Sequence, residues 1–196
     1  MEIKSFTLEG EAVRLAPLKL EHLSELYEAG RDESLWLWTT NIIKSKEDML
    51  RYIETALGEA ARKLSLPFVT IEKSSGAIIG STRFGNIDLS NRKTEIGWTW
   101  ISPKYQRTAT NTEAKLLMLS HAFETWNCVR VELKTDVLNE KSRNAILRIG
   151  AKEEGILRQH LITDAGRLRD TVYFSIIDSE WMTVKANLKE MLRKVE

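Results

Sequence analysis

The sequence predicts a mixed α/β domain around one central sheet of about seven strands, with helices on both faces. Segments with β-branched or alternating apolar residues occur among segments with helical apolar spacing. Their order is a strand, two helices, three strands, a helix, a strand, a helix, two strands and a helix, which is typical of a mixed sheet with packed helices. Residues 1–196 contain no Ser/Gly linker, repeat or low-complexity tract, so we expect one domain.

The composition supports this class and argues against several functions. The chain is 42% hydrophobic, enough for a sizeable core, and its formal net charge of +1 provides no basic field for nucleic acid or an anionic membrane. No apolar stretch approaches the roughly 18 residues of a membrane span, and MEIKSFTLEGEAVRL lacks the apolar centre of a signal peptide. A single cysteine, Cys128, fits a reducing compartment, so we expect a cytoplasmic protein.

The first half of the chain is punctuated by glycine and proline, which set the predicted boundaries. The helix before Gly30 has apolar residues at helical spacing, and the segment SSG reads as the turn of a hairpin. The expected elements are a strand over 12–17, helices over 18–30 and 46–63, and strands over 67–73, 77–89 and 94–102.

The second half contains the most apolar helix, expected over 111–126. Its apolar residues cover so much of its surface that we expect it to lie flat against the sheet. The remaining expected elements are a strand over 128–135, a helix over 142–150, a hairpin of strands 153–162 and 167–177 around TDAG, and a helix over 180–194.

A polar loop, KYQRTATNTEAK, joins the 94–102 strand to the 111–126 helix. The first turn of a helix has unpaired N–H groups and a partial positive charge, so it attracts phosphates. Thr110 and Glu113 fit a T-x-x-E capping box, which predicts a helix start near Asn111. Yet no glycine occurs from Trp98 to Ile149. The spacing alone leaves open a phosphate site or a plain polar connection.

Residues 95–151 resemble the acetyl-CoA-binding half of the GNAT N-acetyltransferase superfamily. The segment 106–111 is similar to its Q/R-x-x-G-x-G/A motif, with Ala109 and Asn111 at the glycine positions. NEKSRNAILRIGA resembles the later N-x-x-A/S…G-F/A segment. The stretches VRLAPLKLEHLSELY and GRLRDTVYFSIIDSEW resemble the branch of ribosomal-protein N-terminal acetyltransferases, so the likeness covers most of residues 12–181.

The resemblance implies a GNAT fold and an acetyl-CoA-dependent N-acetyltransferase that uses no metal. The acceptor would be a protein N-terminus, or a small amine or amino acid, attacking directly in a ternary complex. The net charge of +1 predicts no nucleic-acid or membrane partner, whereas the resemblance makes a homodimer an expectation, because dimers are frequent in this branch. The alternative is a non-catalytic module that binds acyl-CoA or a partner. Ala109 favours that alternative if its position needs a positive φ, where alanine costs roughly 1 kcal/mol or more relative to glycine.

The resemblance also indicates which residues would contact acetyl-CoA. The 94–102 strand would offer backbone groups to the pantetheine amides and the thioester oxygen, the loop would bind the pyrophosphate, and Asn139 would bond the pantetheine arm. The expected cofactor-binding residues are Trp98, Thr99, Trp100, Ile101, Gln106, Arg107, Thr108, Ala109, Thr110, Asn111, Thr112, Asn139 and Ser142.

Glu95 is the candidate base, because it lies eleven residues before Gln106, a spacing found in the family. A glutamate on a half-buried strand can deprotonate an amine. The alternative is a solvent-facing charge paired with Arg83 or Lys93.

Ser142 is the candidate donor to the departing thiolate. The tyrosine that many family members use corresponds to Ile146 here, whereas the ribosomal-type branch has a serine at the position of Ser142. The alternative is that Asn139 and Ser142 only cap a helix. Tyr173 is a weaker candidate for the acid.

Trp36 and Trp38 precede the second helix, where the family builds its acceptor site, so they are candidate substrate contacts. Core packing is the alternative for both, and core placement is expected for Trp98 and Trp100, which share a strand face. The three histidines are too dispersed for a metal site, and Cys128 has no histidine placed to activate it.

Overall fold

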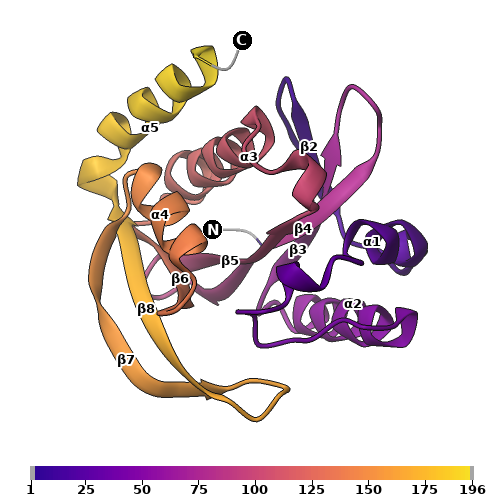
Figure 1. The fold of residues 1–196 in the computed structure, drawn as a ribbon. Coiled ribbons are helices and arrows are strands. Elements are labelled where there is room, and N and C mark those ends of the chain that lie inside the picture. The colour runs from indigo at the N-terminus through magenta and orange to yellow at the C-terminus, as the bar shows by residue number, and fades with distance from the viewer. Residues whose placement is uncertain (1–2, 195–196) are drawn as a thin grey trace.

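The computed structural model describes residues 3–194, which form one eight-stranded sheet with helices on both faces (Figure 1). The predicted mixed α/β class is confirmed. The strand order is β1-β2-β3-β4-β5-β6-β8-β7. The strands are β1 (Leu8–Glu9), β2 (Val13–Pro17), β3 (Leu66–Glu72), β4 (Ile78–Asp88), β5 (Lys93–Ile101), β6 (Arg130–Asp136), β7 (Lys152–Ile162) and β8 (Leu168–Ile177). The strand that the sequence did not predict is β1, whose two residues are too few for a periodic pattern.

Neighbouring strands pair antiparallel, with one exception at the centre of the sheet. There β5 and β6 run parallel, because α3 carries the chain from the end of one to the start of the other. A register shift between Ser81 and Arg83 of β4 leaves Thr82 opposite two residues of β5, which is a β-bulge. Its bulged residue Trp98 has a left-handed backbone, with φ of 50°.

The helices form two groups. In Figure 1, α1 and α2 cover one face of the sheet, and α3, α4 and α5 cover the other. Each group encloses its own buried apolar cluster. The bounds are α1 (Leu23–Ala29), α2 (Lys46–Ala61), α3 (Ala109–Ser120), α4 (Glu140–Arg148) and α5 (Asp178–Arg193), and α3 continues into a π-helical turn over His121–Thr125.

The start of α3 differs from the prediction. The helix begins at Ala109, two residues before Asn111, and its N-cap is Thr108, whose hydroxyl accepts from the Thr110 N–H at 3.4 Å. The predicted Thr110–Glu113 capping box is wrong, because the Glu113 carboxylate instead accepts from the backbone N–H groups of residues 11–13, each at 2.8 Å.

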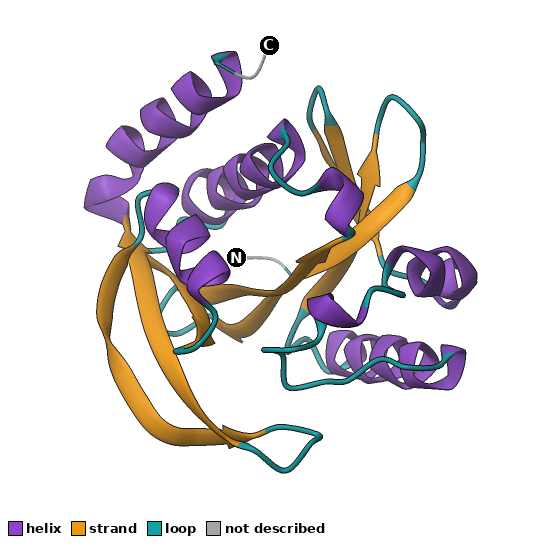
Figure 2. Ribbon diagram, viewed as in Figure 1, coloured by secondary structure: helices purple, strands orange, loops and turns teal. Residues whose placement is uncertain are grey.

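The long β7–β8 hairpin extends from the sheet toward the segment that joins α1 to α2 (Figure 2). At its tip, the Asp164 N–H donates to the Thr40 carbonyl at 2.9 Å, and the Asp164 carboxylate accepts from the Ile42 N–H at 3.0 Å. Two segments about 120 residues apart are therefore clasped together. Over residues 3–194, no helix has the length and apolar content needed to cross a membrane.

Candidate active site

The sheet opens between β5 and β6, and this opening defines the candidate site. The two strands pair only at Lys93–Arg130, Thr94–Val131 and Glu95–Glu132. Beyond Glu95, β5 continues to Ile101 along β4 alone. One backbone edge of β5 therefore has no strand beside it among the described residues, and an extended ligand could pair with that edge.

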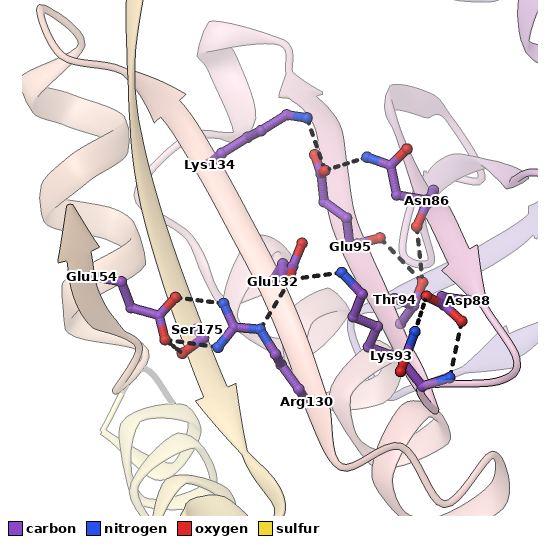
Figure 3. A network of polar contacts seen from close by, with 12 residues as sticks. Asn86, Asp88, Lys93, Thr94, Glu95, Arg130, Glu132, Lys134, Glu154 and Ser175 are labelled. Atoms are coloured by element: carbon purple, nitrogen blue, oxygen red, sulfur yellow. Dashed lines mark hydrogen bonds and ion pairs between the residues drawn. The ribbon is translucent and has the colours of Figure 1, made fainter. Parts of the chain in front are cut away.

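Glu95 lies at the point where the strands separate, and it is 1% exposed. Its Oε2 accepts from Asn86 Nδ2 at 2.7 Å and lies 2.9 Å from Lys134 Nζ (Figure 3). Its Oε1 lies beside Gly97, where a Cβ would be only 2.7 Å away, so the glycine makes room for the carboxylate. A buried carboxylate with one oxygen held and one directed along β5 has the geometry of a positioned base.

The solvent-facing alternative for Glu95 is wrong in both burial and partners. Arg83 instead donates to Glu59 at 2.9 Å, and Lys93 donates to Glu132 at 3.3 Å. Lys134, the partner that Glu95 does have, comes from β6, the strand alongside. Sequence reasoning missed Lys134 because no spacing rule relates residues on two strands joined by a helix.

The loop before α3 gathers hydrogen-bond donors at the helix N-terminus. Gln106 Nε2 donates to the Ile101 carbonyl at 2.9 Å, which ties the loop to the end of β5. Arg107 is exposed, with φ of 62°, and Thr108 caps the helix. The backbone of Ala109 does not have a positive φ. The residue of this loop that does is Arg107. A loop without glycine therefore forms here, and alanine at position 109 carries no backbone cost.

Arg148 adds a cation to this mouth that sequence reasoning missed. It lies in the last turn of α4, and its Nη2 donates to the hydroxyl of Thr112 in the first turns of α3 at 3.2 Å. Only the packing of α4 beside α3 brings the two together. The helix N-terminus with two nearby arginines, Arg107 and Arg148, suits a phosphorylated ligand.

Asn139 is the N-cap of α4, and its Oδ1 accepts from the Ser142 N–H at 3.1 Å. Asn139 and Ser142 thus form the helix cap that was the alternative to a role in catalysis and CoA binding. Ser142 is half-buried in the first turn of this helix. Tyr173, the weaker acid candidate, is half-buried on β8, and Lys134 Nζ lies 5.8 Å from the centre of its ring.

The four tryptophans near the site differ in exposure. For Trp36 the core-packing alternative holds and the substrate contact does not, because Trp36 is 4% exposed, donates from Nε1 to the Gly30 carbonyl at 2.8 Å and packs on Trp100. Trp100 is in the core as expected. Trp98 is only half-buried, because the bulge places its ring beside Gly85 with the Arg83 guanidinium 4.8 Å from the ring centre. Trp38 is half-buried beneath the Arg167 guanidinium.

A pocket of about 240 Å³ lies on the α2 side of the opening. The α1–α2 segment, α2, β4, β5 and the hairpin tip all contribute to it. Arg83 is held at its wall, 2% exposed, with its guanidinium 5.2 Å from the centre of the Tyr52 ring and hydrogen-bonded to Glu59. Its lining combines apolar, aromatic and charged side chains, among them Ile42, Tyr52, Glu59, Arg83, Trp98 and Asp164.

Within residues 3–194, neither Cys128 nor a metal-binding group forms a second centre. Burial raises the pKa of Cys128 to about 11, which keeps its thiol protonated at neutral pH. Across residues 3–194, no three His, Cys, Asp or Glu side chains are grouped so that they could hold a metal ion.

Comparison with known proteins identifies the family. The family described as acetyltransferase (GNAT) domain matches residues 12–152. A Bacillus subtilis protein named "Putative ribosomal N-acetyltransferase YdaF" is 38% identical over 106 residues, which are 54% of this chain and 57% of that protein. The chain thus matches little more than half the length of that relative.

Solved structures share the whole architecture. A GCN5-related N-acetyltransferase from Brucella melitensis superimposes with a TM-score of 0.89 at 31% identity, over 96% of this chain and 86% of that one. Mycobacterium smegmatis RimJ in complex with CoA-disulfide has a TM-score of 0.79 at 23% identity, over 95% and 93%. Together with the family match over residues 12–152, this likeness shows that the chain belongs to the GNAT acetyltransferase family of N-acetyltransferase enzymes.

Proposed function

We propose that this enzyme transfers acetyl from acetyl-CoA to a primary amine while both substrates are bound. The observation that carries the proposal is the free edge of β5, which has the buried Glu95 at one end and the start of α3 at the other. The pantetheine arm would pair with that edge, and the pyrophosphate would bind at the α3 N-terminus beside Arg107 and Arg148. The RimJ complex supports CoA as the ligand of this fold.

The proposed chemistry is direct attack. Glu95, through Oε1 or a water molecule, takes a proton from the acceptor ammonium, and the neutral amine attacks the thioester carbon. The N–C bond forms as the C–S bond breaks, and a backbone N–H of β5 stabilises the developing oxyanion. The nitrogen releases its second proton to solvent as the amide forms. The departing thiolate is protonated by Ser142, the donor that the family resemblance implies, and Ser142 regains a proton from solvent. Holding both substrates in line supplies much of the rate.

The acceptor pocket favours a small amine or the first residues of a peptide. Its volume of about 240 Å³ is below the roughly 300–1,000 Å³ of pockets that enclose a drug-sized ligand. The name of the Bacillus subtilis relative points to ribosomal acceptors. We therefore propose a protein N-terminus as the acceptor, with a free amino acid or small amine as the second choice. The lone, buried Cys128 fits a cytoplasmic location.

The first experiment measures thiol release from acetyl-CoA with a panel of N-terminal peptides, amino acids and polyamines. We expect peptides to give the highest kcat/KM. Turnover of polyamines without turnover of any peptide would contradict the proposed acceptor. The non-catalytic alternative loses its support, because Ala109 has no positive φ.

Glu95→Gln tests the base. We expect kcat to fall roughly 10²-fold, as general base catalysis contributes 10²–10⁴-fold, with unchanged acetyl-CoA binding by calorimetry. The matched control is Glu132→Gln, because Glu132 pairs with Glu95 across the β5–β6 ladder and also binds a lysine. Equal activity in both variants would remove Glu95 from the mechanism.

A further inference from the structure

Lys115 is a buried lysine that the chemistry above does not use. It lies in the second turn of α3 and is 6% exposed. Its Nζ donates to the Thr99 hydroxyl at 2.7 Å. Burial lowers the pKa of its ammonium to about 7. Within residues 3–194 this ammonium pairs with no carboxylate, and burying an unpaired ammonium is costly, so its presence in this helix calls for an explanation.

Two carboxylates on α3 and β5 are bound to other groups. Glu113, two residues earlier on α3, accepts three backbone N–H groups of residues 11–13. On β5, Glu95 is held by Lys134 and Asn86. From β4, the uncharged side chain of Thr82 shares a hydrogen bond of 2.7 Å with the Thr99 hydroxyl.

Thr99 connects this buried lysine to the open edge of the sheet. It follows the bulged residue Trp98 on the part of β5 that β6 no longer accompanies. Thr99 itself is exposed, although Lys115 behind it is not. Thr99 is therefore an exposed residue on the part of β5 that the pantetheine arm is proposed to pair with, and its hydroxyl is hydrogen-bonded to a buried proton donor.

We propose that Lys115 is a positioning residue that supplies, through the Thr99 hydroxyl, the proton taken up by the CoA sulfur as the acetyl group leaves. This inference rests on the proposed acetyl transfer, and it assigns the proton of the sulfur to Thr99 and Lys115 in place of Ser142, the donor that the family resemblance implies. As the C–S bond breaks, its electron pair stays on sulfur, and the Thr99 hydroxyl proton passes to the sulfur. The Lys115 ammonium replaces that proton on Thr99 and becomes a neutral amine, which solvent later reprotonates.

The acidity of the two groups favours this direction. An ordinary thiol has a pKa of about 8.5, so an ammonium with a pKa of about 7 gives its proton to a thiolate downhill. An exposed lysine, with its higher pKa, would not. Burial without a carboxylate partner thus turns a poor acid into one matched to the leaving group.

Steady-state kinetics of Lys115→Met and Thr99→Val test the inference. We expect kcat to fall roughly 10²-fold in each, the range of a lost general acid, with acceptor KM and acetyl-CoA affinity by calorimetry near those of the wild type. The wild-type kcat should decline as pH rises above the pKa of Lys115, and Lys115→Met should lack this decline. Thr99→Ser should retain the rate, and Lys189→Met, at an exposed position on α5, is the control.

A second substrate separates proton supply from packing. A selenolate is a weaker base than a thiolate and leaves without a proton, so acetyl-seleno-CoA should restore most of the rate of Lys115→Met. Wild-type kcat and pH profile in Lys115→Met, or a defect that the selenoester does not relieve, would overturn the inference while acetyl transfer stood. Absence of acetyl-CoA binding by the wild type would instead overturn the proposed function.

Discussion

Arg107 has the left-handed backbone in the loop before α3, with φ of 62°. A non-glycine residue in this region costs roughly 1–2 kcal/mol, and such strain is concentrated at functional sites. The conformation leaves the guanidinium exposed at the mouth of the α3 N-terminus. Replacement by glycine should therefore relieve backbone strain at position 107 and not at position 109.

Two glycine substitutions check this assignment. Ala109→Gly should leave acetyl-CoA affinity unchanged and lower the free energy of unfolding by up to about 1 kcal/mol, because glycine is less favourable in a helix. Arg107→Gly should raise that free energy by about 1 kcal/mol through relief of strain. It should also weaken acetyl-CoA binding up to roughly fivefold, the worth of one exposed charge. Calorimetric titration and urea unfolding measure both, and tighter binding by Ala109→Gly would contradict the conformation described.

Lys115 should make stability depend on pH in a defined direction. Its pKa is about 7 when folded and near its ordinary 10.5 when unfolded, so between these values the unfolded chain binds more protons. Lys115 should therefore increase the free energy of unfolding as pH increases from about 7 to 9. Above 9 the buried Cys128, whose pKa is raised from 9.0, acts oppositely. Urea unfolding at pH 7, 8 and 9 should show a rise that Lys115→Met lacks, and parallel curves would contradict the burial.

At the scale of elements, Glu113 fastens α3 to the β1–β2 turn. Its carboxylate accepts three backbone N–H groups, and Gly10 leaves space for it, since a Cβ there would lie 2.4 Å from the carboxyl carbon. The helix N-terminus that serves the proposed phosphate site is thus anchored by residues a hundred positions earlier.

Glu113→Ala should therefore destabilise the fold strongly. Each buried N–H left unpaired costs about 1–3 kcal/mol, so we expect a loss of at least about 2 kcal/mol in urea unfolding. Glu113→Gln, which keeps one acceptor oxygen, should lose less. The control is Glu54→Ala at an exposed site on α2, which should stay within about 0.5 kcal/mol. A Glu113→Ala protein as stable as this control would show that the hydrogen bonds of the Glu113 carboxylate to residues 11–13 do not stabilise the fold.

At the scale of the whole molecule, two features make the site. The sheet separates between β5 and β6, and the β7–β8 hairpin closes one wall of the pocket by clasping residues 40–42. Neither feature belongs to one element, because each joins segments remote in the chain.

Asp164→Ala tests the clasp. Loss of the carboxylate that accepts from the Ile42 N–H should free the hairpin tip and raise the acceptor KM several-fold, with the acetyl-CoA KM unchanged. Asp164→Asn retains an acceptor oxygen and should stay near the wild type. An equal rise in both KM values would show instead that the hairpin supports the whole fold.

The sequence by itself determined the order of strands and helices apart from β1, and the loop before α3, because these depend on periodicity and turn residues within short segments. Its resemblance to the GNAT family singled out Glu95 as candidate base. Tertiary structure decided where α3 begins, because Glu113 is drawn to residues 11–13 and cannot close a capping box. It decided equally that Glu95 faces Lys134, that Trp36 is buried, and that Arg148 and Asp164 reach the site. Those outcomes depend on contacts between residues far apart in the chain, and no local pattern records them.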